Sequence, residues 1–338
     1  MKKIRMTLFV AAAFACFAAA AWAGTLDAVK HRGALICGSN PGLPGFGMSD
    51  GKGDWTGLDV DYCRALAAAI FNDPKKVTFV QLTVKDRFTA LQSGEIDVLA
   101  RNSAWTESRE ARLGLLFAGV DYYDGQGFMV RKNLHIKSAL ELNGASICVQ
   151  HGVTTDLNLA AYFFSHSIKY EEIAFPSGDE ALSAYDSGRC DAFTSDVSAL
   201  YGERLKLTHP DDNIVLPEVI SKEPLSPAVR SGDDQWFDIA RWTHFAMVDA
   251  EELGVTQANV DDKLRSNNLA IRRLLGEEDD FGKSLGLTKD WAYRIIKDVG
   301  NYGETFDRNL GQGSQLKIKR GLNKLWTKGG LMYAPPLR

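Results

Sequence analysis

Hydrophobic positions along the chain follow two alternating periods, which predicts strands interleaved with helices. From 59 to 71 apolar residues recur every three or four positions, whereas 35–37, 77–80 and 145–149 are short apolar runs typical of buried strands. Further helices are predicted at 86–92, 109–115, 156–164, 203–207, 236–253, 259–264, 269–275 and 288–299. This alternation indicates an α/β fold.

One short unit occurs twice in the chain. Residues 93–97 (Ser-Gly-Glu-Ile-Asp) and 187–191 (Ser-Gly-Arg-Cys-Asp) each follow a helical pattern and lead into an apolar run. Glycine adopts the left-handed conformation that ends many helices, so each unit predicts a helix that stops and turns into a strand. Two copies of this unit predict two lobes.

A polar tip follows each of these apolar runs, at the carboxyl end of a strand, where α/β proteins bind ligands. The first tip, 101–109, ends in Arg109, and the second, 194–196, ends in Asp196. A guanidinium group binds a carboxylate through two parallel donors, and a carboxylate accepts hydrogen bonds from an ammonium group. Two tips facing one cleft would therefore match an amino acid. The alternative for Asp196 is a cap on the helix that follows it.

Two segments are candidates for crossings between the lobes. Residues 121–130 form a glycine-punctuated strand, and residues 222–230 contain prolines that favour an extended path. We therefore expect lobe 1 in 24–130, lobe 2 in 131–224, and a return to lobe 1 with a helical extension in 225–338. The size agrees, because a single core rarely grows beyond about 250–300 residues.

The loop at 40–47 is rich in glycine and proline and precedes the first predicted helix. Either its apolar side chains, Leu43 and Phe46, contact the ligand, or the loop only connects a strand to a hairpin and its aromatic side chain plugs the core. Asp59 and Asp61 lie in the first turn of the helix, where carboxylates complement free amides and the helix dipole. We expect both to cap that helix rather than to act as an acid-base pair.

The loop at 150–155 precedes a predicted helix in the second lobe and contains glycine and hydroxyl side chains. Backbone amides at a helix amino terminus point outward and bind anions. The loop therefore predicts a site for a carboxylate or a phosphate. The alternative is ordinary capping of the helix by Thr154 or Thr155.

The first 23 residues have the layout of a secretory signal, with a basic start, an apolar stretch and Ala21-Trp22-Ala23 as the cleavage site. We expect export with cleavage after Ala23; a lipid anchor at Cys16 is the competing interpretation. Removing the signal's three basic residues leaves 36 basic against 43 acidic side chains, a net charge of −7. Such a surface argues against nucleic acid and anionic lipid as partners.

Four cysteines remain after the signal, and an even number in an exported chain favours disulfides. Two fall in each copy of the repeat, so among three possible pairings we favour Cys37 with Cys63 and Cys148 with Cys190. Four small buried thiols are the alternative. We expect no metal site, because the sequence has no close Cys-x-x-Cys and no cysteine-histidine cluster.

Four longer runs carry a family resemblance: GLDVDYCRALAAAIF at 57–71, YYDGQGFMV at 122–130, ISKEPL at 220–225 and GGLMYAPP at 329–336. With these runs the mature chain resembles the periplasmic amino-acid-binding proteins of ABC importers, among the solute-binding proteins of family 3. The branch it resembles serves general L-amino-acid or glutamate, glutamine, aspartate and asparagine uptake. The resemblance implies a two-lobed periplasmic binding protein fold of type II. Each lobe would be a mixed sheet flanked by helices, joined by two crossing strands.

The resemblance also implies roles for single residues. It places Arg109 on the ligand α-carboxylate and Asp196 on the α-ammonium group. Further ligand contacts and pocket-lining positions fall at Asn102, Ala104, Gly152, Thr154, Leu43, Phe46 and Val84. The branch usually has threonine where this chain has Ala104 and Val153. Because a hydrogen bond to a charged group contributes about 1.5 to 3 kcal/mol, these changes weaken binding or alter ligand preference.

Three functions are compatible with these features. The first is a transport receptor that closes over an L-amino acid and delivers it to a membrane permease. The second is an exported enzyme such as a hydro-lyase, and the third is a sensor that binds a different carboxylate. No acid-base group other than Asp196 stands out at a tip, and no fused signalling domain is evident. We therefore expect a monomeric receptor without catalytic residues or a cofactor.

Overall fold

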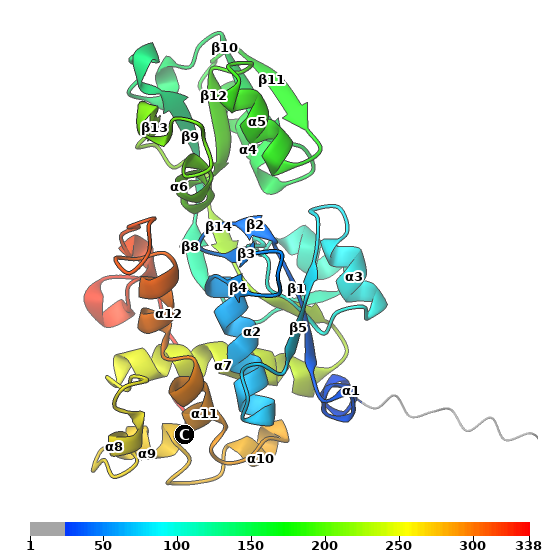
Figure 1. Ribbon diagram of the computed structural model, residues 1–338, viewed down its shortest axis with the longest axis vertical. Helices are drawn as coiled ribbons and strands as arrows, with labels where there is room; N and C mark the ends of the chain where they lie inside the picture. The colour runs from blue at the N-terminus through cyan, green and yellow to red at the C-terminus, as the bar shows by residue number, and fades with distance from the viewer. Residues whose placement is uncertain (1–23) are drawn as a thin grey trace, which may run out of the picture.

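The structure, a computed structural model, describes residues 24–338 and consists of two lobes stacked along the long axis of the molecule (Figure 1). The expected export signal, its cleavage site after Ala23 and the alternative anchor at Cys16 lie outside the described residues. Within 24–338, no helix combines the length and the apolar character that a membrane crossing needs.

Lobe 1 is built on a five-stranded sheet of order β5-β1-β6-β15-β7. Its strands are β1 (Leu35–Ser39), β5 (Val77–Gln81), β6 (Val98–Leu99), β7 (Leu115–Phe117) and β15 (Ala228–Arg230). β1 runs parallel to β5 and β6, whereas β15 pairs antiparallel with β6 and β7. The helices that accompany this sheet are α1 (Thr25–Arg32), α2 (Leu58–Phe71), α3 (Arg87–Ser93) and α7 (Asp234–Glu252). A small antiparallel sheet of β2 (Gly42–Leu43), β3 (Gly47–Ser49) and β4 (Trp55–Thr56) lies on the side facing lobe 2 (Figure 1).

Lobe 2 repeats this plan with the sheet order β11-β10-β12-β9-β13. Its strands are β9 (Gln126–Arg131), β10 (Ala145–Gln150), β11 (Tyr170–Phe175), β12 (Ala192–Asp196) and β13 (Asn213–Val215). The helices are α4 (Thr154–Ser165), α5 (Gly178–Asp186) and α6 (Val197–Arg204). Buried side chains form one cluster around Phe128 and Phe163 and another around Tyr185 and Phe193.

Two short antiparallel strands connect the lobes: β8 (Tyr122–Asp124) and β14 (Glu223–Leu225). The return crossing lies where the prolines at 222–230 predicted it. The first crossing is shorter than expected, because β9 pairs with β12 and β13 and therefore belongs to lobe 2. The boundary at residue 130 is thus wrong: lobe 2 begins directly after β8.

The C-terminal part of the chain is packed into lobe 1. Its helices are α8 (Val260–Lys263), α9 (Leu269–Leu274), α10 (Gly282–Leu285), α11 (Trp291–Asp298) and α12 (Tyr302–Asn309). Trp291, Ile295, Tyr302 and Phe306 belong to the same buried cluster as α2 and α7. The sequence patterns did not predict α12, and after it the chain returns to the hinge side of the lobe (Figure 1).

Both Ser-Gly units end a helix as predicted. Gly94 closes α3 with a left-handed φ of 81°, and Gly188 follows α5 with a φ of 84°. The helix expected at 109–115 is wrong, because the chain makes only a five-residue π-helical turn at Ser108–Arg112 before β7 begins. Leu115 and Phe117 are buried in the sheet, so burial of alternate side chains prevails over the helical spacing.

Neither predicted capping aspartate caps α2. The residue before the helix is Gly57, and the amides of Leu58 and Asp59 donate instead to the Gly45 and Phe46 carbonyls. Asp59 Oδ2 instead accepts from the Asn102 amide at 2.8 Å, and Asp61 Oδ2 accepts from Arg308 Nε at 2.8 Å. Both carboxylates therefore hold distant segments against the helix, a role that local sequence does not encode.

The structure contains the two disulfides that the repeat favoured. Cys37 is bonded to Cys63 with Cα atoms 6.3 Å apart, and Cys148 is bonded to Cys190 with Cα atoms 5.6 Å apart. The first joins β1 to α2, and the second joins β10 to the turn between α5 and β12.

Candidate functional site

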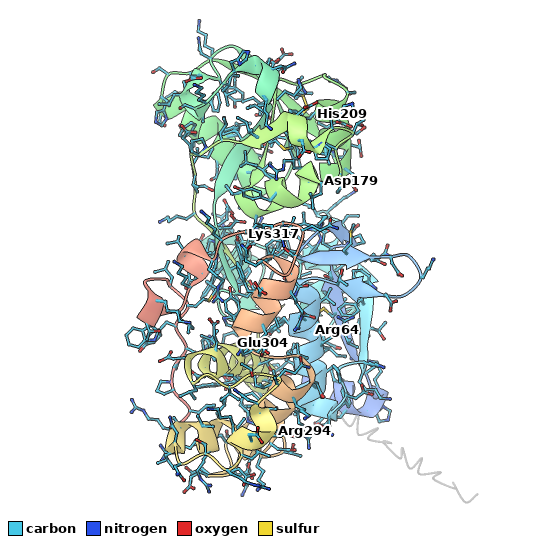
Figure 2. All side chains as sticks on the ribbon, turned by 60° about the vertical axis from the view of Figure 1, so that its left-hand side comes forward. Arg64, Asp179, His209, Arg294, Glu304 and Lys317 are labelled. Carbon is cyan, nitrogen blue, oxygen red and sulfur yellow. A yellow bond between two sulfur atoms is a disulfide. The ribbon has the colours of Figure 1, made fainter. Side chains whose placement is uncertain are left out.

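A cavity of about 390 Å³ lies between the lobes. Lobe 1 contributes 40–43, 81–85, Arg87, Arg101, Asn102, Ala104 and Arg109, and lobe 2 contributes Gln150, 153–155, 176–179, 193–196, Ala199 and Glu203. Both polar tips therefore face the same cleft, as their position after the strands predicted. Figure 2 shows one of these residues, Asp179, on the side of lobe 2 that faces lobe 1.

Arg109 approaches the cavity from the π-helical turn in which the first tip ends. Its Nη1 donates to the Ala104 carbonyl at 2.7 Å, and the guanidinium lies over the Phe88 ring at 5.3 Å from the centroid. Burial lowers the pKa of Arg109, and the charges of Glu223 and Asp196 partly oppose that change. Within 24–338 its remaining guanidinium donors have no protein acceptor, so they are available to an anion.

Asp196 reaches the cavity from the opposite lobe, at the end of β12. Its Oδ1 is buried without a hydrogen-bond partner, and its side chain does not cap α6. The capping role belongs to Asp124 from the hinge, whose carboxylate accepts from the Ser198 amide and hydroxyl. The capping alternative for Asp196 is therefore wrong, and its carboxylate is free.

Electrostatics at Asp196 favour an incoming cation. Burial raises the pKa of Asp196 well above its usual range, and the charges of Asp124 and Glu223 raise it further. Arg109 and Arg87 partly offset this rise, but neither donates a hydrogen bond to its Oδ1. An ammonium group placed beside Asp196 would thus stabilise a carboxylate that the protein itself leaves uncompensated.

Arg87 is a cationic cleft residue that the sequence analysis missed. It lies in the first turn of α3, is 3% exposed, and donates from Nη1 to Ser103 Oγ at 3.3 Å. Its Nε is buried without a partner, and burial and the charges of Arg101 and Arg109 lower its pKa. An arginine in a first helical turn opposes the helix dipole. That mismatch was the available signal of a role outside the helix.

The first tip presents fewer ligand contacts than the family resemblance implied. The amide of Asn102 is already bonded to Asp59, a carboxyl whose pKa burial raises to about 7. Ala104 faces Leu225 of β14 in a pair flanked by two hydrogen bonds, Trp105 N to Pro224 O and Ser226 N to Ser103 O. In such a pair the backbone groups of Ala104 itself point away from β14, which agrees with the bond from Arg109.

In lobe 2 the loop after β10 leads directly into α4. Gly152 has a φ of 78°, a conformation that favours glycine, and the residue before the helix is Val153, without a side-chain cap. Thr154 Oγ1 donates to Glu223 at 2.8 Å, so capping by Thr154 is wrong. The first residues of α4 line the cavity, and their backbone amides can donate hydrogen bonds to an anion.

The apolar residues expected at the pocket divide into two groups. Leu43 and Val84 line the cavity, whereas Phe46 is absent from its wall. Phe46 is buried in the core of lobe 1 and meets the edge of Tyr122 at 5.4 Å between ring centroids. For Phe46 the core alternative is therefore correct.

One side chain of lobe 2 bonds to lobe 1 at the rim of the cleft. Lys206 Nζ donates to the Gly42 carbonyl at 3.2 Å and pairs with Asp179 at 2.6 Å and Glu203 at 2.7 Å. No group of three or more His, Cys, Asp or Glu residues within 24–338 is arranged to hold a metal ion.

Two sheets joined by two strands, with unpaired charges of opposite sign facing one cavity, define a two-lobed binding protein of the kind that closes around a small ligand. The chain belongs to the bacterial extracellular solute-binding proteins of family 3, which match residues 35–258.

Relatives of known description extend this match beyond the family region. The chain is 59% identical to the general L-amino acid-binding periplasmic protein AapJ of Rhizobium johnstonii, over 97% of each chain. It is 53% identical to the glutamate/glutamine/aspartate/asparagine-binding protein BztA of Rhodobacter capsulatus, over 96% of each chain. A periplasmic binding protein of an ABC transporter from Brucella ovis, solved with glutathione bound, is 58% identical. The match covers 94% of this chain and all of that one, with a TM-score of 0.92.

Proposed function

We propose that this protein is the periplasmic receptor of an ABC importer and that its cleft captures L-amino acids. Arg109 binds the α-carboxylate, together with the free amides of α4, and Asp196 binds the α-ammonium group. The observation that carries the proposal is the unpaired Oδ1 of Asp196, buried across the cleft from Arg109. A zwitterion compensates the charges of Arg109 and Asp196 at once, and it can do so only by contacting both lobes. Closure is then favoured because the ligand contacts both lobes.

Arg87 supports a preference for acidic side chains. It is buried, retains an unpartnered Nε and lines the same cavity as Arg109. A carboxylate on the ligand side chain would stabilise this second cation. Ala104 provides only a methyl group at the tip, so affinity rests more on the ionic contacts than in relatives with threonine there.

The size of the cavity and the glutathione in the Brucella ovis protein favour a second candidate ligand class. Glutathione carries its free α-carboxylate and α-ammonium on one glutamyl end, so that end could occupy the same two charges. A cavity of about 390 Å³ lies within the range of sites that hold ligands larger than one amino acid. Small γ-glutamyl peptides are therefore included in the test.

The test is a thermal-shift screen of the refolded, ligand-stripped mature protein. The ligands are the twenty amino acids, glutathione, dicarboxylates and the matching hydroxy acids. A saturable rise in melting temperature for acidic or polar L-amino acids is expected, because a ligand that binds only the folded state stabilises it. A rise with hydroxy acids or dicarboxylates but with no amino acid would reject L-amino acids as the ligand class.

We expect the protein to be a monomer that delivers its ligand, chemically unchanged, to a membrane permease. Mass spectrometry of the bound ligand after prolonged incubation checks the first point. Conversion of the ligand would instead support an enzyme on this scaffold. Light scattering of the ligand-bound protein measures its mass and checks the expected monomer.

A further inference from the structure

The C-terminal segment 259–338 lies outside the region that matches the family, yet it bonds to the hinge. Asn323 is 3% exposed and ends a 3₁₀ turn at Gly321–Asn323. Its Oδ1 accepts from the Tyr123 amide at 2.7 Å, and its Nδ2 donates to the Tyr123 carbonyl at 3.1 Å. One side chain thus satisfies both backbone groups of the central residue of β8.

The hinge needs such a partner because of its pairing. Tyr123 faces Pro224 across the β8–β14 ribbon, and proline has no amide hydrogen to donate. Tyr123 therefore directs its amide and carbonyl away from β14, along an open strand edge. The amide group of Asn323 has one acceptor and two donors, so it can take the place of a third strand. Both bonds form together only while Tyr123 is extended, since its amide and carbonyl then point the same way.

The opposite edge of this ribbon carries the ligand tip. Trp105 N donates to Pro224 O at 2.8 Å, and Ala104, next to it, accepts from Arg109. Asn323, β8, β14 and the first tip are therefore four neighbours in one continuous hydrogen-bonded layer. A shift of β8 would be transmitted through β14 to the residues that hold Arg109.

Asn323 is itself fixed to lobe 1. Arg320 Nε donates to the Asn323 carbonyl at 2.8 Å, and its guanidinium pairs with Glu251 of α7 at 3.0 Å. The same guanidinium lies over the ring of Phe306 at 4.8 Å. The contact to β8 is thus anchored in the core of the larger lobe.

We propose that Asn323 is a positioning residue for ligand binding, through which the C-terminal segment holds β8 extended and fastened to lobe 1. The lobes then bend where β8 ends, at Asp124 and Gly125, and at Ser221 on the return crossing. Gly125 suits that place, because a Cβ there would come within 2.5 Å of the Ser221 carbonyl. The first tip keeps its position while lobe 2 moves. This inference adds to the proposed function, and one of its two tests needs no ligand.

The first test is hydrogen exchange, followed by mass spectrometry, on the ligand-free protein with Asn323→Ala and Asn323→Asp. In Asn323→Ala we expect exchange in the peptide containing Tyr123 to be at least tenfold faster. In Asn323→Asp, which keeps the acceptor for the Tyr123 amide, we expect a smaller increase. The matched control is Asn301→Ala, because Asn301 is equally buried in the same segment, caps α12 and bonds to Val255 away from the hinge. An unchanged hinge in Asn323→Ala, or an equal increase in the control, would overturn the proposal.

The second test is stopped-flow binding of the amino acid that gives the largest thermal shift. We expect Asn323→Ala to release it at least fivefold faster, with an association rate within twofold of the wild type, while Asn301→Ala matches the wild type in both. Equal release rates in all three proteins would contradict the positioning role. If Asn323→Ala does not fold, Asn323→Asp decides both tests. If no amino acid binds, the proposed function fails, and hydrogen exchange still decides this inference.

Discussion

Replacing Asp196 with asparagine tests the site most directly, because the change removes a charge and keeps the shape. Asp196 Oδ1 is buried without a partner, and Asp124 and Glu223 repel its negative charge. Leaving a buried polar group without a partner costs about 1–3 kcal/mol, and more when the group is charged. Asparagine keeps a polar group at this place, so the substitution removes only the additional cost of the charge. We therefore expect Asp196→Asn to raise the free energy of unfolding of the ligand-free protein by about 1 kcal/mol, or roughly 2 °C in melting temperature.

The difference in the free energy of unfolding between Asp196→Asn and the wild type should change with pH in one direction. The pKa of Asp196 in the folded protein lies above the ordinary value of 3.8, so the folded state holds this proton more tightly than the unfolded state. The destabilisation from the ionised carboxylate is absent below pH 3.8 and grows as pH rises toward the folded-state pKa. The variant should thus gain most over the wild type at neutral pH and very little near pH 4.

Ligand affinity should change in the opposite direction. Loss of a hydrogen bond to a charged group corresponds to about 1.5–3 kcal/mol, or roughly 10- to 150-fold weaker binding of an amino acid. The matching hydroxy acid has no ammonium group and should lose much less. Calorimetric titration measures both affinities, and thermal melts from pH 4 to pH 8 measure stability.

Asp191→Asn is the matched control for this experiment. Asp191 lies just before β12, and its carboxylate accepts from the Ser146 amide at 2.8 Å and the Ser146 hydroxyl at 2.7 Å, bonds that lower its pKa. This variant should lose stability at neutral pH and keep its affinity. The reasoning about Asp196 is refuted if Asp196→Asn is less stable than the wild type without ligand. Equal losses for amino and hydroxy acids would refute the ammonium assignment.

Further predictions concern the tip and the disulfides. Arg109→Ala should weaken amino-acid binding at least 100-fold while the ligand-free melting temperature stays within about 2 °C, since the one hydrogen bond that its guanidinium makes to protein contributes only about 1 kcal/mol; unchanged affinity in a titration would reject the carboxylate assignment. Ala104→Thr should tighten amino-acid binding about tenfold by adding a hydroxyl, whereas weaker binding in the same titration would mean that the methyl group fits the ligand. Reducing both disulfides should lower the free energy of unfolding by about 3 to 4 kcal/mol for each bond in the chain-entropy description, for spans of 26 and 42 residues. Denaturant titration measures that loss, and a free thiol found by mapping unreduced peptides would contradict the pairing.

Much of the architecture could be predicted from local sequence. Gly94 and Gly188 end their helices in the conformation that glycine favours, and the tips that follow both reach the cleft. These predictions succeeded because they depend on neighbouring residues and on the geometry of a strand end. The α/β class and the two lobes follow from the same signals.

The roles of several single side chains could not be predicted, because they depend on contacts between residues that are distant in the sequence. Asp59 stands where carboxylates often cap a helix, but its partner is the Asn102 amide, which the fold brings near. Phe46 is equally suited to a core and to a pocket, and its packing in the buried cluster of lobe 1, against Tyr122, decides for the core. Arg87 looks like a surface residue of a short helix, but in the fold it is buried at the wall of the cleft. Which way a polar side chain points is thus decided by tertiary packing, which a spacing pattern does not record.

Each disulfide lies wholly within one lobe, and neither spans the cleft. Oxidation of the cysteines therefore stiffens each lobe separately and does not restrict the motion of one lobe relative to the other. An oxidising compartment would make the protein more resistant to unfolding without slowing its opening. A reducing one would soften each half while their relative motion persisted, so durability and mobility are separately adjustable in this architecture.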